Sequence, residues 1–100
     1  PILLSGSAIA KDQKQDACIK VLGAGIYNAT LEDVCKFNGG VKERLLAMYN
    51  EAGCKMIIPQ KTVERIAADV LLDTKRRYKA MGHQAFCEGN IDAYNALQEE

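Results

Sequence analysis

Hydrophobic and polar residues alternate with a helical period along most of the chain, and the longest such pattern covers residues 59–82. Its apolar positions recur at three- and four-residue steps, which places them on one stripe of an α-helix. Pro59 suits a first helical turn because it lacks an amide hydrogen, and Gly82 suits helix termination. We therefore predict a helix of about 33 Å at the centre of the domain. The stripe consists of Val63, Ile66, Ala67, Val70, Leu71, Thr74, Tyr78 and Met81.

Shorter helical patterns surround this segment and predict an all-α fold. Asn28 and Thr30 are helix-capping residues, so we expect one helix to end there and another to begin. Asn90 is expected to cap the last helix in the same way. The four apolar residues 55–58 have no partner strand, and we interpret them as a loop that covers one end of the core. The predicted helices span residues 11–27, 31–37, 41–52 and 59–82, with a turn at 83–89. A last helix begins at Asn90 and includes Ile91, Tyr94 and Leu97. The fold class is all-α, with four to five helices in one small bundle-like domain.

The composition is that of a globular protein with balanced charge. The 100 residues include 13 basic and 13 acidic side chains, and 48% are hydrophobic. A general nucleic-acid or anionic-membrane binder would need a net positive charge, which this chain lacks. No apolar run approaches the length of about 18 residues that suggests a membrane-spanning helix. We therefore expect no nucleic-acid partner and no membrane span.

Four cysteines in so short a chain favour two disulfides over a metal site, because no Cys-x-x-Cys pair is present. Disulfides in turn imply export to an oxidising compartment, either the periplasm or the outside of the cell. If consecutive helices run antiparallel, heights along the bundle disfavour the pairing Cys18–Cys35 with Cys54–Cys87. Of the three pairings, Cys18–Cys87 with Cys35–Cys54 leaves the smallest mismatch, and we predict it.

The first ten residues are apolar and precede a charged segment, and two interpretations stay open for them. The sequence Ala8-Ile9-Ala10 resembles the cleavage site of a signal peptide, so residues 1–10 could be a signal-peptide remnant. The alternative is an ordinary apolar N-terminal arm. In both cases residues 11–100 are expected to form a single helical domain.

The residues that could carry catalysis are few, and we predict that the protein is not an enzyme and uses no metal or cofactor. His83 and Cys87 are four residues apart and could form a metal pair or a Cys–His nucleophile. A catalytic cysteine must be a free thiolate, however, and the even number of cysteines favours disulfides. Asp69 and Asp73 lie one helical turn apart, a spacing that suits a general acid–base pair. Asp73 with Arg77, and Asp69 with the charges that flank it, are more simply interpreted as a solvated face.

The densest cluster of charge lies near the end of the long helix. Arg76, Arg77, Tyr78 and Lys79 are our predicted partner-binding residues, because Arg and Tyr are enriched in binding hot spots. Residues 55–60 are the alternative edge of this surface. Two simpler interpretations compete: the charges complement the helix dipole, and Tyr78 belongs to the core because it lies on the apolar stripe.

In outline, the chain resembles the small exported immunity proteins that neutralise type VI secreted peptidoglycan amidases. The resemblance is carried by the Ala8-Ile9-Ala10 site, the helical pattern throughout and the four cysteines. It implies a periplasmic inhibitor that binds a secreted hydrolase and occludes its active site, and it implies a homodimer as a further expectation. A second outline match is to periplasmic acid-stress chaperones. A small lipid carrier is another alternative, since Met48, Met56 and Met81 could line an adaptable apolar pocket.

Overall fold

The computed structural model describes the backbone of residues 2–98 and the side chains of residues 12–98. Within these residues the chain forms five helices and no strand, which confirms the predicted all-α class. The predicted helices at 41–52 and 59–82 are also confirmed, within a residue at each end. The helices are α1 (Ile2–Val34), α2 (Val41–Glu51), α3 (Cys54–Ile57), α4 (Gln60–Met81) and α5 (His83–Gln98).

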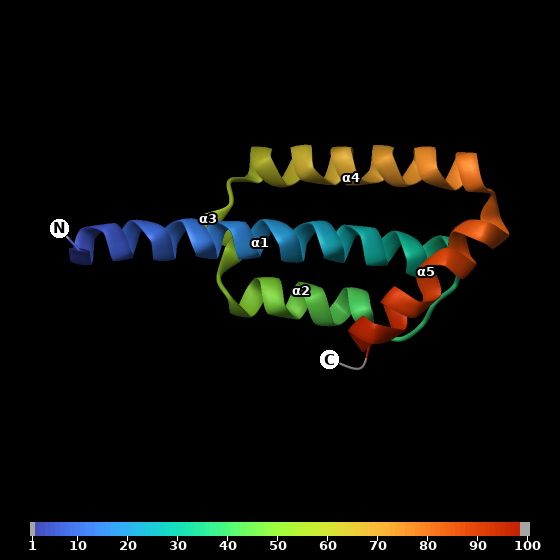
Figure 1. Cartoon of the computed structure of the whole chain (residues 1–100), viewed down its shortest axis with the longest axis horizontal. Coiled ribbons are helices and arrows are strands. Elements are labelled where there is room, and N and C mark those ends of the chain that lie inside the picture. The colour runs from blue at the N-terminus through green and yellow to red at the C-terminus, as the bar shows by residue number, and fades with distance from the viewer. Residues whose placement is uncertain (1, 99–100) are drawn as a thin grey trace.

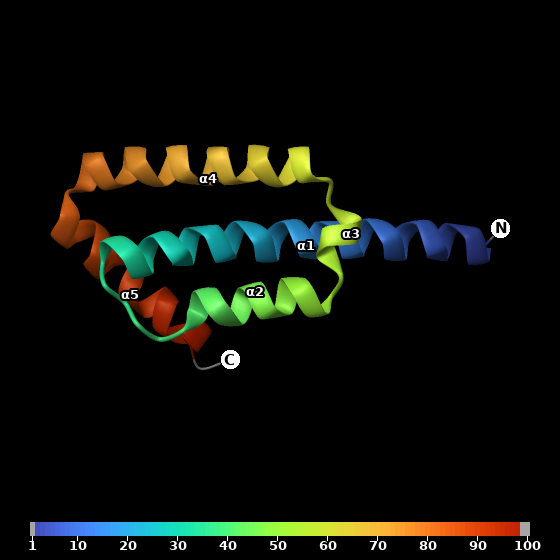
Figure 2. The ribbon, with the colours of Figure 1, turned by 180° about the vertical axis from the view of Figure 1, so that it is seen from behind.

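Three of the helices lie side by side in a flat layer, with α1 in the middle (Figure 1). Helix α2 runs antiparallel to α1 along one side, and α4 runs parallel to α1 along the other. The connection from α2 to α4 crosses α1 and contains the short helix α3. Helix α5 closes the end of the layer where α1 and α4 finish (Figure 2). The Cα atoms extend over 54 × 27 × 20 Å. The helix at the centre is therefore α1, and our prediction that the 59–82 helix occupies this place was wrong.

Helix α1 is continuous to Val34, so the predicted break at residues 28–30 is also wrong. The reason lies in the two capping residues, whose side chains turn back onto the preceding helical turn. Asn28 donates from Nδ2 to the carbonyl oxygen of Ala24 at 2.7 Å, and Thr30 donates from Oγ1 to that of Ile26 at 3.1 Å. Such bonds allow Asn and Thr to sit inside a helix. The backbone of residues 2–10 belongs to α1 as well, and its origin as an arm or a signal remnant stays a prediction.

The predicted turn at residues 83–89 is wrong for the same reason, a side-chain hydrogen bond to the preceding helical turn. Asn90 donates from Nδ2 to the carbonyl oxygen of Phe86 at 2.7 Å instead of capping a new helix, and α5 runs unbroken from His83. The segment 55–58, predicted as a loop, is mostly the short helix α3. Gly53 precedes α3 with a φ of 70°, which allows the chain to leave α2 sharply.

Two disulfides connect the layer, but their pairing differs from the prediction. Cys18 is bonded to Cys54 and Cys35 to Cys87, each with a Cα–Cα distance of 5.6 Å. The predicted pairing failed because it assumed a helix break at residue 28 and antiparallel neighbours throughout. With α1 unbroken and α4 parallel to it, the start of α4 lies beside the middle of α1 and its end lies beside the end of α1. Cys54 precedes α4 and therefore lies near Cys18, in the middle of α1. Cys87 follows α4 and therefore lies near Cys35, just after the end of α1.

The core consists of two clusters, one near each disulfide. The first lies between α1, the end of α2 and α3, and the second between the end of α1, the start of α2 and α5. In the second cluster Glu32 accepts hydrogen bonds from the hydroxyl of Tyr94 at 2.8 Å and from the backbone amide of Lys42 at 3.0 Å. Its carboxylate thus serves the N-terminus of α2, where Gly40 offers no side chain for capping. Burial, followed by the hydrogen bond to Glu32, raises the pKa of Tyr94.

None of the helices in the part of the chain that the structure describes combines the length and apolar character that a bilayer crossing requires.

Candidate protein-binding site

Helix α4 is largely exposed to solvent. Of its 22 residues only Thr74 is fully buried, with 2% of its surface exposed. Leu71 and Leu72 are 49% and 51% exposed. A molecule that covered the helix would remove the apolar surface of both leucines from water, which is favourable. Helix α4 is therefore a candidate partner-binding surface.

An apolar groove runs between α4, the end of α1 and the start of α5. It has a volume of about 240 Å³ and is lined by Thr30, Val34, Leu71, Thr74, Lys75, Tyr78 and Phe86. The hydroxyls in its wall are already used: Thr30 and Thr74 donate to carbonyl oxygens four residues earlier, at 3.1 and 2.6 Å. The Tyr78 hydroxyl lies 2.7 Å from Nδ1 of His83. The groove therefore offers mainly carbon surface to a ligand, and Lys75 is the one charged residue in its lining.

The predicted residues Arg76 and Lys79 lie exposed on the outer side of α4. Lys79 follows Lys75 by four residues, so the two ammonium groups project from the same side of the helix about 6 Å apart along its axis. Among the described side chains, neither of these lysines nor Arg76 has an acidic group within ion-pair distance. The groove is thus bordered by uncompensated positive charge.

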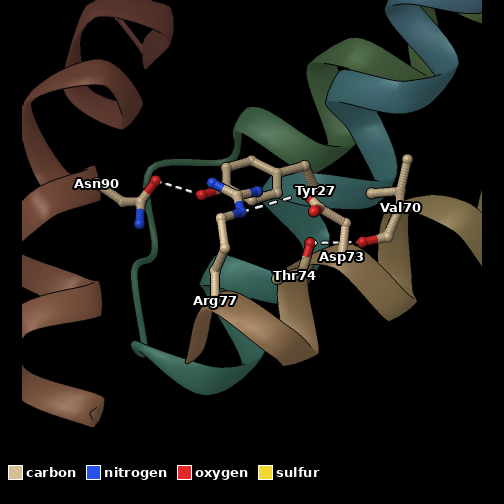
Figure 3. A network of polar contacts seen from close by, with 6 residues as sticks. All are labelled: Tyr27, Val70, Asp73, Thr74, Arg77 and Asn90. Carbon is tan, nitrogen blue, oxygen red and sulfur yellow. Dashed lines mark hydrogen bonds and ion pairs between the residues drawn. The ribbon is translucent and has the colours of Figure 1, made fainter. Parts of the chain in front are cut away.

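Arg77, also predicted as a partner-binding residue, is directed elsewhere. Its guanidinium lies 5.0 Å above the ring centroid of Tyr27, and its Nε is 3.2 Å from a carboxylate oxygen of Asp73 (Figure 3). Tyr27 in turn donates a hydrogen bond to Asn90 on α5. Arg77 is about 200° around the helix from Lys75. It ties α4 to α1 on the flank away from the groove, through the ring of Tyr27.

Tyr78, the fourth predicted residue, is half-buried and belongs to the core, as its place on the apolar stripe indicated. Its ring meets Phe86 edge-on, with 5.3 Å between centroids. The neighbouring His83 has its Nε2 4.0 Å from Sγ of Cys87. Because that sulfur is bonded to Cys35, the proposed Cys–His nucleophile has no thiolate. The structure thus separates the four predicted residues: Arg76 and Lys79 face outward, Arg77 faces Tyr27, and Tyr78 forms part of the groove wall.

A second apolar groove lies on the other side of α1, against α2 and α3. Its volume is about 440 Å³, and Lys14 is the one charged residue among those that line it. The remaining lining residues are Ala17, Cys18, Val21, Met48, Ala52, Cys54 and Ile57. Among the described side chains, no group of three or more His, Cys, Asp or Glu residues is placed to hold a metal ion.

Comparison with known proteins gives no relative: no family model, no curated protein and no solved structure matches the chain.

Sequence reasoning missed the groove and its principal residues, Leu71 and Lys75. The pattern places Leu71 on the apolar stripe, and the predicted partner-binding residues do not include Lys75. A signal was present, because a stripe of eight positions from Val63 to Met81 is wider than one neighbouring helix can cover. The outer members of such a stripe must stay exposed or meet a partner.

Proposed function

We propose that this protein is a small exported binding module that acts by occluding a partner protein. The observation that carries the proposal is the exposure of α4, a 22-residue helix with one fully buried side chain and two half-exposed leucines. Among the described side chains, Lys75, Arg76 and Lys79 near its end have no acidic group within ion-pair distance. Apolar surface bordered by charge is a frequent arrangement in protein interfaces. A disulfide anchors the chain just before α4 and another just after its end, so the helix is held in place before binding.

Such preorganisation supports an inhibitor in particular. A rigid surface has little conformational entropy to lose on binding, so more of its contact energy becomes affinity. An occluding interface buries about 800 Å² on each partner, which the length of α4 together with its neighbours can supply. The specific form that we propose is an immunity protein whose partner is a secreted peptidoglycan amidase, and the two disulfides are compatible with such an exported protein.

The test is co-purification from the native host, followed by a functional assay. The partner identified by mass spectrometry would be expressed alone, and its hydrolysis of peptidoglycan measured while this protein is added. We expect activity to fall linearly to zero at a one-to-one ratio. A partner that binds tightly and keeps full activity would exclude inhibition, and a partner that is not a hydrolase would exclude the immunity role.

A second candidate function, a carrier of small apolar ligands, is favoured by the α1–α2–α3 groove. Its volume of about 440 Å³ falls within the range of roughly 300–1,000 Å³ that is typical of ligand pockets. Native mass spectrometry of protein purified from its host would show a bound lipid if this were its role. A mass equal to that of the oxidised chain would argue against it.

A further inference from the structure

The α1–α4–α5 groove is too small for a typical ligand and large enough for one apolar side chain. Its volume of about 240 Å³ lies below the range of roughly 300–1,000 Å³ that ligand pockets occupy. Interfaces, by contrast, often bury a single aromatic or aliphatic anchor in a pocket of this kind. The hydroxyl groups of Thr30 and Thr74 already donate to backbone carbonyl oxygens, so Lys75 at the border of the groove is the one charged donor that an anchor would meet. The rest of the wall is carbon surface and favours an apolar occupant.

The charges beside the groove define what must accompany that anchor. Lys75 lines the groove and Lys79 lies one turn farther along, about 6 Å away along the axis. A helix presents carboxylates at positions i and i+4 with the same separation of about 6 Å. Basic residues at these two positions of the partner helix would repel Lys75 and Lys79. Acidic residues there would pair with the lysines and guide the partner during encounter.

We propose that the groove binds an acidic amphipathic helix of the partner protein. One apolar side chain of that helix enters the groove beside Leu71, and carboxylates one turn apart pair with Lys75 and Lys79. This inference rests on the proposed function, since it names the part of the partner that the α4 surface recognises. It keeps the predicted residues Tyr78, which lines the groove, and Lys79, and it leaves out Arg77, which lies on the opposite flank of α4.

The probe for this proposal is a synthetic peptide of about 18 residues, long enough to hold a helix. It has leucine on one face and glutamate on the positions beside that face, and a control peptide has lysine in place of each glutamate. Binding is measured by fluorescence anisotropy at low and at high salt. We expect the acidic peptide to bind, with an affinity that falls about tenfold or more as salt screens the charges, and the basic peptide not to bind.

Two neighbouring leucines provide a matched pair of variants. Leu71 and Leu72 are almost equally exposed, at 49% and 51%, but only Leu71 lines the groove. Leu71→Ala should weaken binding of the acidic peptide about fivefold or more, because it removes an anchor contact, while Leu72→Ala should change binding less than about twofold. For the charges, Lys75→Glu with Lys79→Glu should abolish binding. Lys61→Glu with Arg65→Glu alters the net charge of α4 equally at its other end and should retain most of the affinity.

The outcomes separate this inference from the proposed function. Equal effects of Leu71→Ala and Leu72→Ala, binding of the basic peptide, or no binding of the acidic peptide at millimolar concentration would each overturn it. Sedimentation velocity without peptide adds another check, because self-association that Leu71→Ala removes would assign the groove to a second copy instead. A natural partner that is inhibited equally by the wild type and by Leu71→Ala would keep the inhibitor function and discard this site.

Discussion

Arg76 and Arg77 are neighbours in the sequence, yet only the second guanidinium has partners within the described molecule. Arg77 lies above the ring of Tyr27 and pairs with Asp73, whereas Arg76 is exposed. Arg77→Ala should therefore lower the free energy of unfolding by about 1 kcal/mol, and Arg76→Ala should change it by less than about 0.5 kcal/mol. Urea denaturation of both variants measures the difference. Equal losses would show that the stacking on Tyr27 contributes nothing to stability.

Ionisation of Tyr94 makes the free energy of unfolding depend on pH in the alkaline range. Its pKa is raised above 10.0, first by burial and then by the hydrogen bond to Glu32, so the folded state holds the phenolic proton more tightly than the unfolded state does. This contribution is fully present below pH 10 and is lost as the pH rises through the raised pKa. The free energy of unfolding should thus decline above pH 10, measured by denaturant titration at several pH values. Tyr94→Phe loses the bond to Glu32 and the bond that the hydroxyl accepts from the backbone amide of Gly39, so it is less stable at neutral pH. In this variant the same part of the decline should be absent.

At the scale of elements, capping residues were the main source of error in reading the sequence. Asn28, Thr30 and Asn90 all predicted helix boundaries, and all three lie inside helices with their side chains bonded to the preceding turn. Both arrangements are open to these residue types, and only tertiary packing selects between them. The group that does serve the start of α2 is Glu32, ten residues before the amide of Lys42. No local pattern announces a contact of that kind. Helices α2 and α4, whose boundaries carry Gly and Pro, were predicted correctly.

Glycines at an element boundary and inside an element should respond in opposite ways to the same substitution. Gly53 has a φ of 70° between α2 and α3, and Gly23 lies in the middle of α1; a methyl group at either position would meet no atom within 4 Å. Gly53→Ala should cost about 1–2 kcal/mol, because a side chain strains the left-handed conformation. Gly23→Ala should instead stabilise the protein by up to about 1 kcal/mol through helix propensity. Thermal unfolding of the two variants checks the sign, and a neutral Gly53→Ala would contradict the argument.

For the whole molecule, the apolar periodicity predicted the class of fold but not its topology. Apolar stripes on helices can be covered by a closed bundle or by the flat layer in Figure 1, so the periodicity does not distinguish the two arrangements. What decides between them is the length of α1, which spans the layer and lets α2 and α4 pack on opposite sides. The predicted length of this helix depended on whether Asn28 and Thr30 cap a helix end. A wrong interpretation of these two residues therefore changed the predicted arrangement of the whole molecule. It placed the wrong helix at the centre, exchanged the disulfide partners and concealed the open flank of α4 that forms the candidate site.

The disulfides should decide whether the layer persists. They close segments of 36 and 52 residues, and each should stabilise the fold by about 4 kcal/mol through the unfolded chain. Together they approach the whole stability expected of a small domain, about 5–15 kcal/mol. We expect the oxidised protein to have no reactive thiols and the fully reduced protein to lose its cooperative transition, as followed by circular dichroism. Reduced protein that melts at the temperature of the oxidised form would show that helix packing alone holds the layer.

The pairing itself can be read from a tryptic digest without reduction, because cleavable residues separate all four cysteines. Cleavage after Lys and Arg leaves Cys18 in residues 15–20, Cys35 in 21–36, Cys54 in 45–55 and Cys87 in 80–100. The structure requires that 15–20 be joined to 45–55 and 21–36 to 80–100. Mass spectrometry should find these two pairs and should lose both after reduction. If 15–20 were instead joined to 80–100, the start of α5 would have to lie beside the middle of α1, and α4 could not run parallel to it.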